Sequence, residues 1–250
     1  MGSGRTVVVT GGARGIGRAV VERFAAAGDD VLALGRDPGS LARLSAEVPG
    51  AVRTARVDVT DEDEVAACFG PLGPVDVLVC NAGAADSAPV ARTSLESWRR
   101  MLDVNATGVF LCTRAVVGAM RERDRGRIVT VASTAGRVGA PYTAAYSASK
   151  HAAVGLMRAV AAELAGTGVT ANAVCPTFVD TDMTAASVAR IAERTGRSAD
   201  EGRAALAAAS PLGRLLAPGE VADAVAWLSS DGAGAVNGQA VVLDGGGIQA

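Results

Sequence analysis

Short apolar runs alternate with amphipathic segments from one end of the chain to the other. Seven of the runs are rich in β-branched residues and are apolar at consecutive positions, which predicts strands that are covered on both faces. The predicted strands are Thr6–Thr10, Val31–Gly35, Val52–Val57, Val75–Cys80, Arg127–Ala132, Val169–Val174 and Ala240–Leu243. The predicted helices between them are Ile16–Ala27, Leu41–Val48, Glu62–Phe69, Leu95–Arg123, Ala144–Leu164 and Glu220–Ser229.

The alternation of strands and helices predicts the fold class. Strands joined by helical crossovers form parallel sheets, so we expect an α/β fold with a doubly wound, seven-stranded parallel sheet of the Rossmann type. No long linker interrupts the pattern, and residues 1–250 are predicted to form a single domain. The predicted helix Leu95–Arg123 is long for a globular protein, and we expect a break near Asn105–Gly108.

Residues 184–210 differ in composition from the rest of the chain. They are rich in alanine and carry a charged helical face that includes Asp200, Glu201 and Arg203. One interpretation is a solvated pair of helices. The other is a mobile helical substrate lid, because doubly wound folds bind their ligands at the carboxyl edge of the sheet.

Composition and charge argue against several classes of protein. The net charge of −2 and the pI near 5.5 are not those of a general nucleic-acid or anionic-membrane binder. No apolar stretch approaches the ~20 residues that span a bilayer. The four cysteines are widely spaced and His151 is the single histidine, so no metal site is expected. The N-terminal residues lack the pattern of a signal peptide, and we expect a cytoplasmic location.

A glycine-rich turn connects the first predicted strand to the first predicted helix. Gly11, Arg14, Gly15, Ile16 and Gly17 belong to this turn. Glycines allow the backbone to turn tightly and allow a pyrophosphate to approach the free N–H groups of the helix N-terminus. In this position of an alternating β/α chain, the turn predicts a dinucleotide site.

The end of the second predicted strand distinguishes the two nicotinamide dinucleotides. An acidic residue there binds the adenine ribose of NAD(H) and repels a 2′-phosphate, whereas this strand is followed by Arg36. Arg14 in the glycine turn is expected near the same ribose. The two arginines favour NADP(H) over NAD(H), unless both are ordinary solvated side chains. A pairing of Asp37 with Arg36 would weaken that preference.

A tyrosine and a lysine stand four residues apart at the start of a predicted helix. Lys150 is the only lysine among 24 Lys and Arg residues, and it follows Tyr146 at the i,i+4 spacing that places both on one face. A tyrosine with a pKa near 10 exchanges protons poorly at neutral pH unless a cation stabilises its phenolate. Ser133, which follows the fifth predicted strand, can bind a substrate oxygen. Taken alone, the pair would be read as the surface of an amphipathic helix.

Combined with the glycine turn, this pattern resembles the short-chain dehydrogenase/reductase family in its single-domain form. The resemblance covers essentially the whole chain. Its markers, in order, are Thr10–Gly17, Asp58, Asn81-Ala82-Gly83, Asn105, Ser133, Tyr146, Lys150, Pro176 and Thr181. The family usually has glycine after Pro176 where this chain has Thr177, so we expect a differently shaped loop there.

The resemblance also implies roles for individual residues. Asn105, Ser133, Tyr146 and Lys150 match the catalytic tetrad, in which Asn105 would hold a water next to Lys150. The remaining implied cofactor contacts are Asp58 and Val59 on the adenine side, Asn81, Ala82 and Gly83 along the adenosine, Tyr146 and Lys150 at the nicotinamide ribose, and Pro176, Val179 and Thr181 at the nicotinamide.

The implied activity is hydride transfer between a nicotinamide and a carbonyl or carbinol carbon. Residues 146–151 and 174–181 are most similar to 3-oxoacyl-thioester reductases and polyketide ketoreductases, so we expect NADP(H)-dependent reduction of a small-molecule or carrier-bound ketone. The pocket should be lined by 84–90, 134–142 and 177–187, with Arg137 as an anion contact. Members of this family are commonly tetramers, and a homo-oligomer is expected.

Two other functions remain open from the sequence. One is a dehydrogenase or reductase of a small cyclic ketone or alcohol, which would use the same residues. The other, from a different class, is a non-catalytic sensor that binds NADP(H). An intact Tyr146/Lys150 pair counts against the sensor because a protein that only binds the cofactor does not need it.

Overall fold

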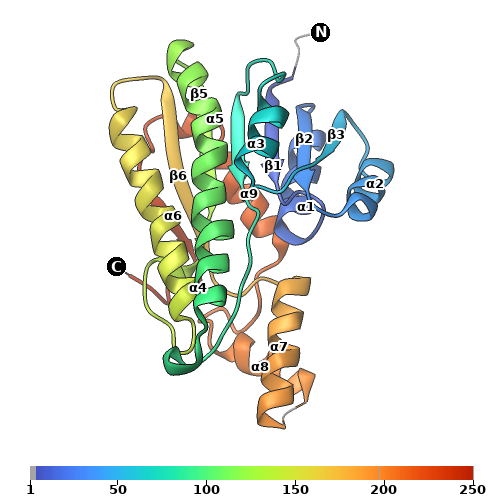
Figure 1. Cartoon of the computed structure of the whole chain (residues 1–250), viewed down its shortest axis with the longest axis vertical. Coiled ribbons are helices and arrows are strands. Elements are labelled where there is room, and N and C mark those ends of the chain that lie inside the picture. Colours follow the sequence, from blue (N-terminus) through green and yellow to red (C-terminus); the bar gives the residue numbers. More distant parts are fainter. Residues whose placement is uncertain (1–3, 197, 250) are drawn as a thin grey trace.

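Seven parallel strands form the centre of the molecule (Figure 1). The computed structural model describes residues 4–196 and 198–249, and within them the strand order is β3-β2-β1-β4-β5-β6-β7. The strands are β1 (Thr6–Thr10), β2 (Asp30–Gly35), β3 (Val52–Arg56), β4 (Val77–Cys80), β5 (Gly126–Val131), β6 (Val169–Pro176) and β7 (Ala240–Leu243). The predicted fold class is therefore confirmed, and the predicted bounds of β1 and β7 agree with the structure.

Helices cover both faces of this sheet. They are α1 (Gly15–Ala26), α2 (Pro38–Glu47), α3 (Glu62–Phe69), α4 (Leu95–Leu102), α5 (Gly108–Glu122), α6 (Ala144–Glu163), α7 (Asp182–Thr195), α8 (Ala199–Ala208) and α9 (Pro218–Leu228). One apolar core joins α3, α5 and α6 to the sheet, and the other joins α1, α2 and α9 to its opposite face. Along β1 the side chains alternate between them, with Val8 in the first core and Val7 and Val9 in the second.

The long predicted helix is broken where a break was expected. Residues 95–122 form α4 and α5, and a π-helical turn, η2 (Asp103–Thr107), connects them. A π turn adds one residue to the helix and is usually found at functional sites. It places Asn105, which is 1% exposed, between the loop after β4 and α6.

The strand order places the chemistry-bearing loops at one edge. After β1 the chain continues to β2 on one side of it, and β4 lies on the other side of β1. The strands β1 and β4 therefore form the topological switch point of the sheet. The loops after β1, β4, β5 and β6 all leave from the carboxyl edge. Among the described residues, no helix is both long enough and apolar enough to cross a membrane.

Helices α7 and α8 make up most of the segment 184–210. They pack against each other and project beyond the carboxyl ends of the strands (Figure 1). The segment is therefore a helix pair at the edge where a lid would act. Arg197, between the two helices, lies outside the described residues.

Candidate active site

The glycine turn forms an open cradle at the N-terminus of α1. Gly11 and Gly15 have φ angles of +62° and +53°, a backbone region that favours glycine. A Cβ atom on Gly17 would stand 2.1 Å from the carbonyl oxygen of Gly11. Arg14 is the N-cap and its side chain makes no capping hydrogen bond, so no side chain caps the N-terminal amides of α1. These features fit a dinucleotide pyrophosphate.

The loop after β4 holds the glycine turn in place. The amide of Asn81 donates to the carbonyl oxygens of Thr10 at 3.1 Å and Gly11 at 3.0 Å. The backbone N–H groups of Asn81 and Ala82 both donate to the Thr10 hydroxyl at 3.0 Å. The structure thus brings the predicted residues Asn81 and Ala82 against the glycine turn. Thr10, which begins the marker Thr10–Gly17, thus has a supporting role that the sequence did not predict.

The loop after β6 approaches the cradle from the other side. A Cβ atom on Gly15 would lie 3.2 Å from Cγ2 of Thr181, so this threonine faces the turn. Thr181 also caps α7, and the carbonyl of Val179 accepts a hydrogen bond from the Thr184 hydroxyl at 2.6 Å. Thr177 donates its backbone N–H to Leu243 at 3.0 Å and does not have positive φ, so glycine is not required there.

Arg36 lies beside Asp58 rather than Asp37. Its Nη1 is 3.6 Å from Oδ2 of Asp58, and the arginine side chain is 69% exposed. Asp37 instead caps α2 by accepting hydrogen bonds from the backbone N–H and the hydroxyl of Ser40. The proposed pairing of Asp37 with Arg36 is therefore replaced by a helix cap, which the sequence Asp-Pro-Gly-Ser favours.

Asp58 is ionised under ordinary conditions. Partial burial opposes its charge, but hydrogen bonds from the N–H and hydroxyl of Thr60, together with Arg36, hold the pKa of this carboxyl below its usual value. The neighbouring Val59 is buried, with its side chain against Gly108 at the start of α5. This corner therefore presents one anion and one exposed cation at the end of β2 and β3.

Ser133, Tyr146 and Lys150 meet at the carboxyl end of β5. Ser133 lies close enough to Tyr146 to influence its hydroxyl, and the Ser133 Oγ accepts a hydrogen bond from the N–H of Ala135 at 3.1 Å. Lys150 lies one turn along α6, with Nζ 5.9 Å from the centre of the Tyr146 ring, and it donates to the carbonyl of Val131 at 2.9 Å. The structure therefore brings these three predicted residues together.

Burial shifts the pKa values of this pair in opposite directions. It raises the pKa of Tyr146, which the hydroxyl of Ser133 partly offsets. It lowers the pKa of Lys150 to about 8, because the ammonium lies in the protein interior, and the thiol of Cys175 acts in the opposite direction without cancelling this shift. Near neutral pH the tyrosine is thus protonated and most of the lysine is charged.

The amide of Asn105 is committed to protein groups. Its Oδ1 accepts from the N–H of Ala84 at 2.9 Å, and its Nδ2 donates to the carbonyl of Ala84 at 2.9 Å and to the hydroxyl of Ser149 at 3.0 Å. A Cβ on Gly83 would stand 3.2 Å from Asn105 Oδ1 and 3.7 Å from Lys150 Nζ. The water expected beside Lys150 remains a prediction. Because the side-chain amide is occupied, the group of Asn105 left to bind that water is its main-chain carbonyl.

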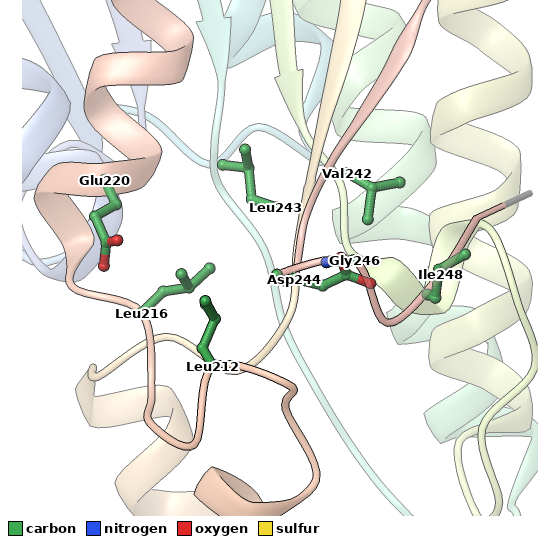
Figure 2. Close-up of a pocket in the computed structure, with 9 residues that line it drawn as sticks. Leu212, Leu216, Glu220, Val242, Leu243, Asp244, Gly246 and Ile248 are labelled. Atoms are coloured by element: carbon green, nitrogen blue, oxygen red, sulfur yellow. The ribbon is translucent and has the colours of Figure 1, made fainter.

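A hollow of about 460 Å³ is lined by other residues than those of this site (Figure 2). It is formed by the end of β7, the chain that leads into α9 and the C-terminal segment, with Leu216 and Leu243 among its lining residues. Val179 forms a β-bridge with Leu216, so the hollow lies behind the loop after β6. Neither Tyr146 nor Lys150 lines the hollow. The candidate site is therefore defined by the polar side chains of Ser133, Tyr146 and Lys150 and not by this hollow.

Comparison with known proteins identifies the family. A family model described as short chain dehydrogenase matches residues 5–192. The chain is 34% identical over 247 residues to the 3-oxoacyl-[acyl-carrier-protein] reductase FabG of Escherichia coli strain K12, covering 97% of each. It is 39% identical over 254 residues to the cis-4-hydroxycyclohexanecarboxylate dehydrogenase of Sinomonas cyclohexanicum, covering 97% of this chain and 96% of that protein.

A solved structure gives the same result in three dimensions. The fold matches that of a single-substitution variant of actinorhodin polyketide ketoreductase with NADPH at a TM-score of 0.94 and 38% identity, covering 97% of each chain. Sequence and fold therefore agree. The chain belongs to the short-chain dehydrogenase/reductase family and is an oxidoreductase.

Proposed function

We propose that this enzyme uses NADPH to reduce a ketone, of the 3-oxoacyl-thioester or polyketide type, to a secondary alcohol. The observation that carries the proposal is the meeting of Ser133, Tyr146 and Lys150 at the carboxyl edge of the sheet, where the glycine turn also lies. The names of two relatives, a 3-oxoacyl reductase and a polyketide ketoreductase, support this substrate class.

Ser133, Tyr146 and Lys150 have different roles in the proposed proton transfer. The hydroxyls of Ser133 and Tyr146 are adjacent, so both can donate to one carbonyl oxygen of the substrate. Tyr146 gives up its proton as negative charge develops on that oxygen, and the Lys150 cation stabilises the phenolate that results. When bound, the nicotinamide supplies the hydride. Asn105 supports the group from η2, beside Lys150.

The residues around the cradle fit NADP(H). Arg14 and Arg36 are proposed to bind the 2′-phosphate, because the glycine turn is hydrogen-bonded to the end of β2 through Gly12 and Leu34 at 3.0 Å. The remaining proposed contacts are Gly11, Gly15, Ile16 and Gly17 at the pyrophosphate, Asp58 and Val59 near the adenine, Asn81, Ala82 and Gly83 along the adenosine, and Tyr146, Lys150, Pro176, Val179 and Thr181 at the nicotinamide side.

Exposed apolar side chains surround the proposed substrate site. Val90, Val138, Tyr142, Phe178 and Met183 are exposed, and all lie on or next to loops that leave the carboxyl edge. Apolar surface of this kind favours an acyl chain or a ring system over a sugar, because the hydroxyls of a sugar would lose their hydrogen bonds to water.

The decisive experiment is a turnover assay with purified protein and NADPH. The substrates are 3-oxoacyl thioesters, bicyclic ketones and small cyclic ketones, the last because one relative is a cyclohexanecarboxylate dehydrogenase. We expect NADPH oxidation with the thioesters and bicyclic ketones. Protein that binds NADPH and oxidises none of it with any of these ketones would contradict the proposal and favour the sensor. Turnover of the small cyclic ketones alone would favour the second candidate, a dehydrogenase of small cyclic alcohols.

The pH dependence of ketone reduction follows from Lys150. Its pKa in the free enzyme is lowered to about 8, so the cation is present below that pH and is lost above it. We expect kcat/KM for reduction to be level through neutral pH and to fall above pH about 8, since kcat/KM reports the free enzyme. Because Lys150 is the only lysine, its titration can also be followed as a single lysine side-chain NMR signal. A lysine signal that titrates near its ordinary value would contradict the assignment.

Helices α7 and α8 are proposed to act as the substrate lid. Arg203 of α8 forms a two-pronged ion pair with Asp180, with Nη1 to Oδ1 at 2.9 Å, and Asp180 lies in the same loop as Val179 and Thr181. Both partners are half exposed, so the pair contributes little to global stability. Its effect should therefore be seen in the placement of the lid.

Replacing Arg203 with alanine should raise KM for the ketone about fivefold and leave kcat and Tm nearly unchanged. The matched control is Arg23→Ala, which breaks the exposed pair between Arg23 of α1 and Asp223 of α9, on helices that are not part of the lid. Steady-state kinetics with the best ketone measures the effect. Equal KM values for the two variants would leave the lid without support.

A further inference from the structure

A buried hydroxyl connects α6 to the π turn beside the proposed catalytic pair. Ser149 has no exposed surface and lies between Tyr146 and Lys150 in the sequence. Its Oγ donates to the carbonyl of Tyr146 at 2.7 Å and accepts from Nδ2 of Asn105 at 3.0 Å. One serine therefore contacts the backbone of the proposed proton donor and the side chain of the π turn.

The direction of these hydrogen bonds follows from counting protons. A serine hydroxyl has one proton, and here it goes to the Tyr146 carbonyl, so the oxygen can meet Asn105 only as an acceptor. The amide of Asn105 has two protons, which go to Ser149 and to the carbonyl of Ala84. Its oxygen accepts the N–H of Ala84. Every proton in this buried group thus has an oxygen acceptor, with the sulfur of Met101 as a weaker third contact of Nδ2 at 4.0 Å, and the amide has one orientation.

The position of Asn105 matters because of what lies next to it. Gly83 of the loop after β4 lies beside both groups, since a Cβ atom placed on it would stand 3.2 Å from Asn105 Oδ1 and 3.7 Å from Lys150 Nζ. The π turn that carries Asn105 contains one residue more than a regular helical turn and depends on tertiary contacts to hold it. A shift of Asn105 would therefore change the surroundings of Lys150 Nζ.

We propose that Ser149 is a positioning residue of the active site, which holds the Asn105 amide and its π turn against the Tyr146/Lys150 pair. The inference rests on the proposed reductase function. The alternative is a purely local role, in which the hydroxyl only satisfies a helical carbonyl, as serines in helices often do. The two roles differ because only the first acts through Asn105.

The first test compares Ser149→Ala with Ser147→Ala. Ser147 lies in the same part of α6, and its hydroxyl is 2.8 Å from the Thr143 hydroxyl. We expect Ser149→Ala to lower kcat about tenfold, with little change in KM or in NADPH affinity, because misplaced groups slow the chemical step more than binding. Ser147→Ala should keep the wild-type kcat. An unchanged kcat in Ser149→Ala would overturn the proposal.

The second test asks whether Ser149 acts through Asn105. In an Asn105→Ala background the hydroxyl has no amide to hold, so adding Ser149→Ala should cause no further loss of kcat. If the effects of the two substitutions on kcat multiply, the serine acts independently of Asn105 and the proposal is wrong. The cycle uses kcat with the best ketone and NADPH.

A third measurement needs no substrate. The N–H of Ala84 donates to Asn105 Oδ1, so its hydrogen exchange reports whether the amide is held. Ser149→Ala should speed exchange at Ala84 about tenfold, and Ser147→Ala should not. Exchange that is equal in the two variants would overturn the inference even if the enzyme is active. Wild-type protein that reduces no ketone would overturn the proposed function, and the exchange rate would then decide whether Ser149 holds Asn105.

Discussion

Replacing Tyr146 with phenylalanine should lower kcat for ketone reduction about a thousandfold while the affinity for NADPH changes by less than about threefold. The substitution removes the hydroxyl beside Ser133 and keeps the ring over which Lys150 lies. The proton donor is lost, and the packing of the first turn of α6 is retained. Stopped-flow or steady-state kinetics with NADPH measures the first quantity, and quenching of protein fluorescence by NADPH the second.

The chain provides a matched control for this experiment. Tyr142 is the only other tyrosine, and it is 66% exposed in the loop before α6. Tyr142→Phe removes a hydroxyl four positions away and keeps the ring that borders the proposed substrate site, so we expect kcat close to that of the wild type and any change to be confined to KM. Turnover by Tyr146→Phe at the wild-type rate would exclude Tyr146 as the proton donor. Loss of turnover in both variants would point to a structural effect of the loop.

The sheet could be predicted from the sequence because its strands are buried on both faces. Continuous apolar runs such as Val7–Val9 and Val77–Val79 can be accommodated only between two layers of helices. The runs give the bounds of β1 and β7, whereas the predicted bounds of the other five strands differ from the structure by one or two residues. Helix ends were harder to predict. The start of α2 at Pro38, rather than at Leu41, depends on the cap formed by Asp37, for which only a pairing with Arg36 had been considered as an alternative.

Only some contacts of the site could be predicted from the sequence. The spacing of Tyr146 and Lys150 predicts their contact because it is a local property of one helix. The contact between Asn105 and Ser149 joins residues 44 positions apart, and it exists because a π turn rotates the asparagine towards α6. No spacing rule predicts such a contact. The same holds for the ion pair between Arg36 and Asp58, which depends on the pairing of β2 with β3.

The second large effect concerns the cofactor. Replacing Arg36 with aspartate should weaken NADPH binding about a hundredfold and strengthen NADH binding, so that the preference between the two cofactors reverses. The arginine side chain is 69% exposed, so its guanidinium is available to a 2′-phosphate at the end of β2. Its ion-pair contact in this region is Asp58, at 3.6 Å. A carboxylate at this position would repel that phosphate and accept hydrogen bonds from the ribose hydroxyls of NADH.

The control must make the same change of charge elsewhere on the sheet. Arg53 is near the start of β3, where its Nη2 lies 3.0 Å from Oδ2 of Asp30 at the start of β2, and Arg53→Asp should leave both affinities unchanged. Dissociation constants for NADPH and NADH, measured at one ionic strength, give the ratio that decides the question, since charged contacts weaken with salt. An unchanged ratio in Arg36→Asp would remove this residue from the cofactor site. A reversed ratio in Arg36→Asp, with an unchanged ratio in Arg53→Asp, would assign the 2′-phosphate contact to the end of β2.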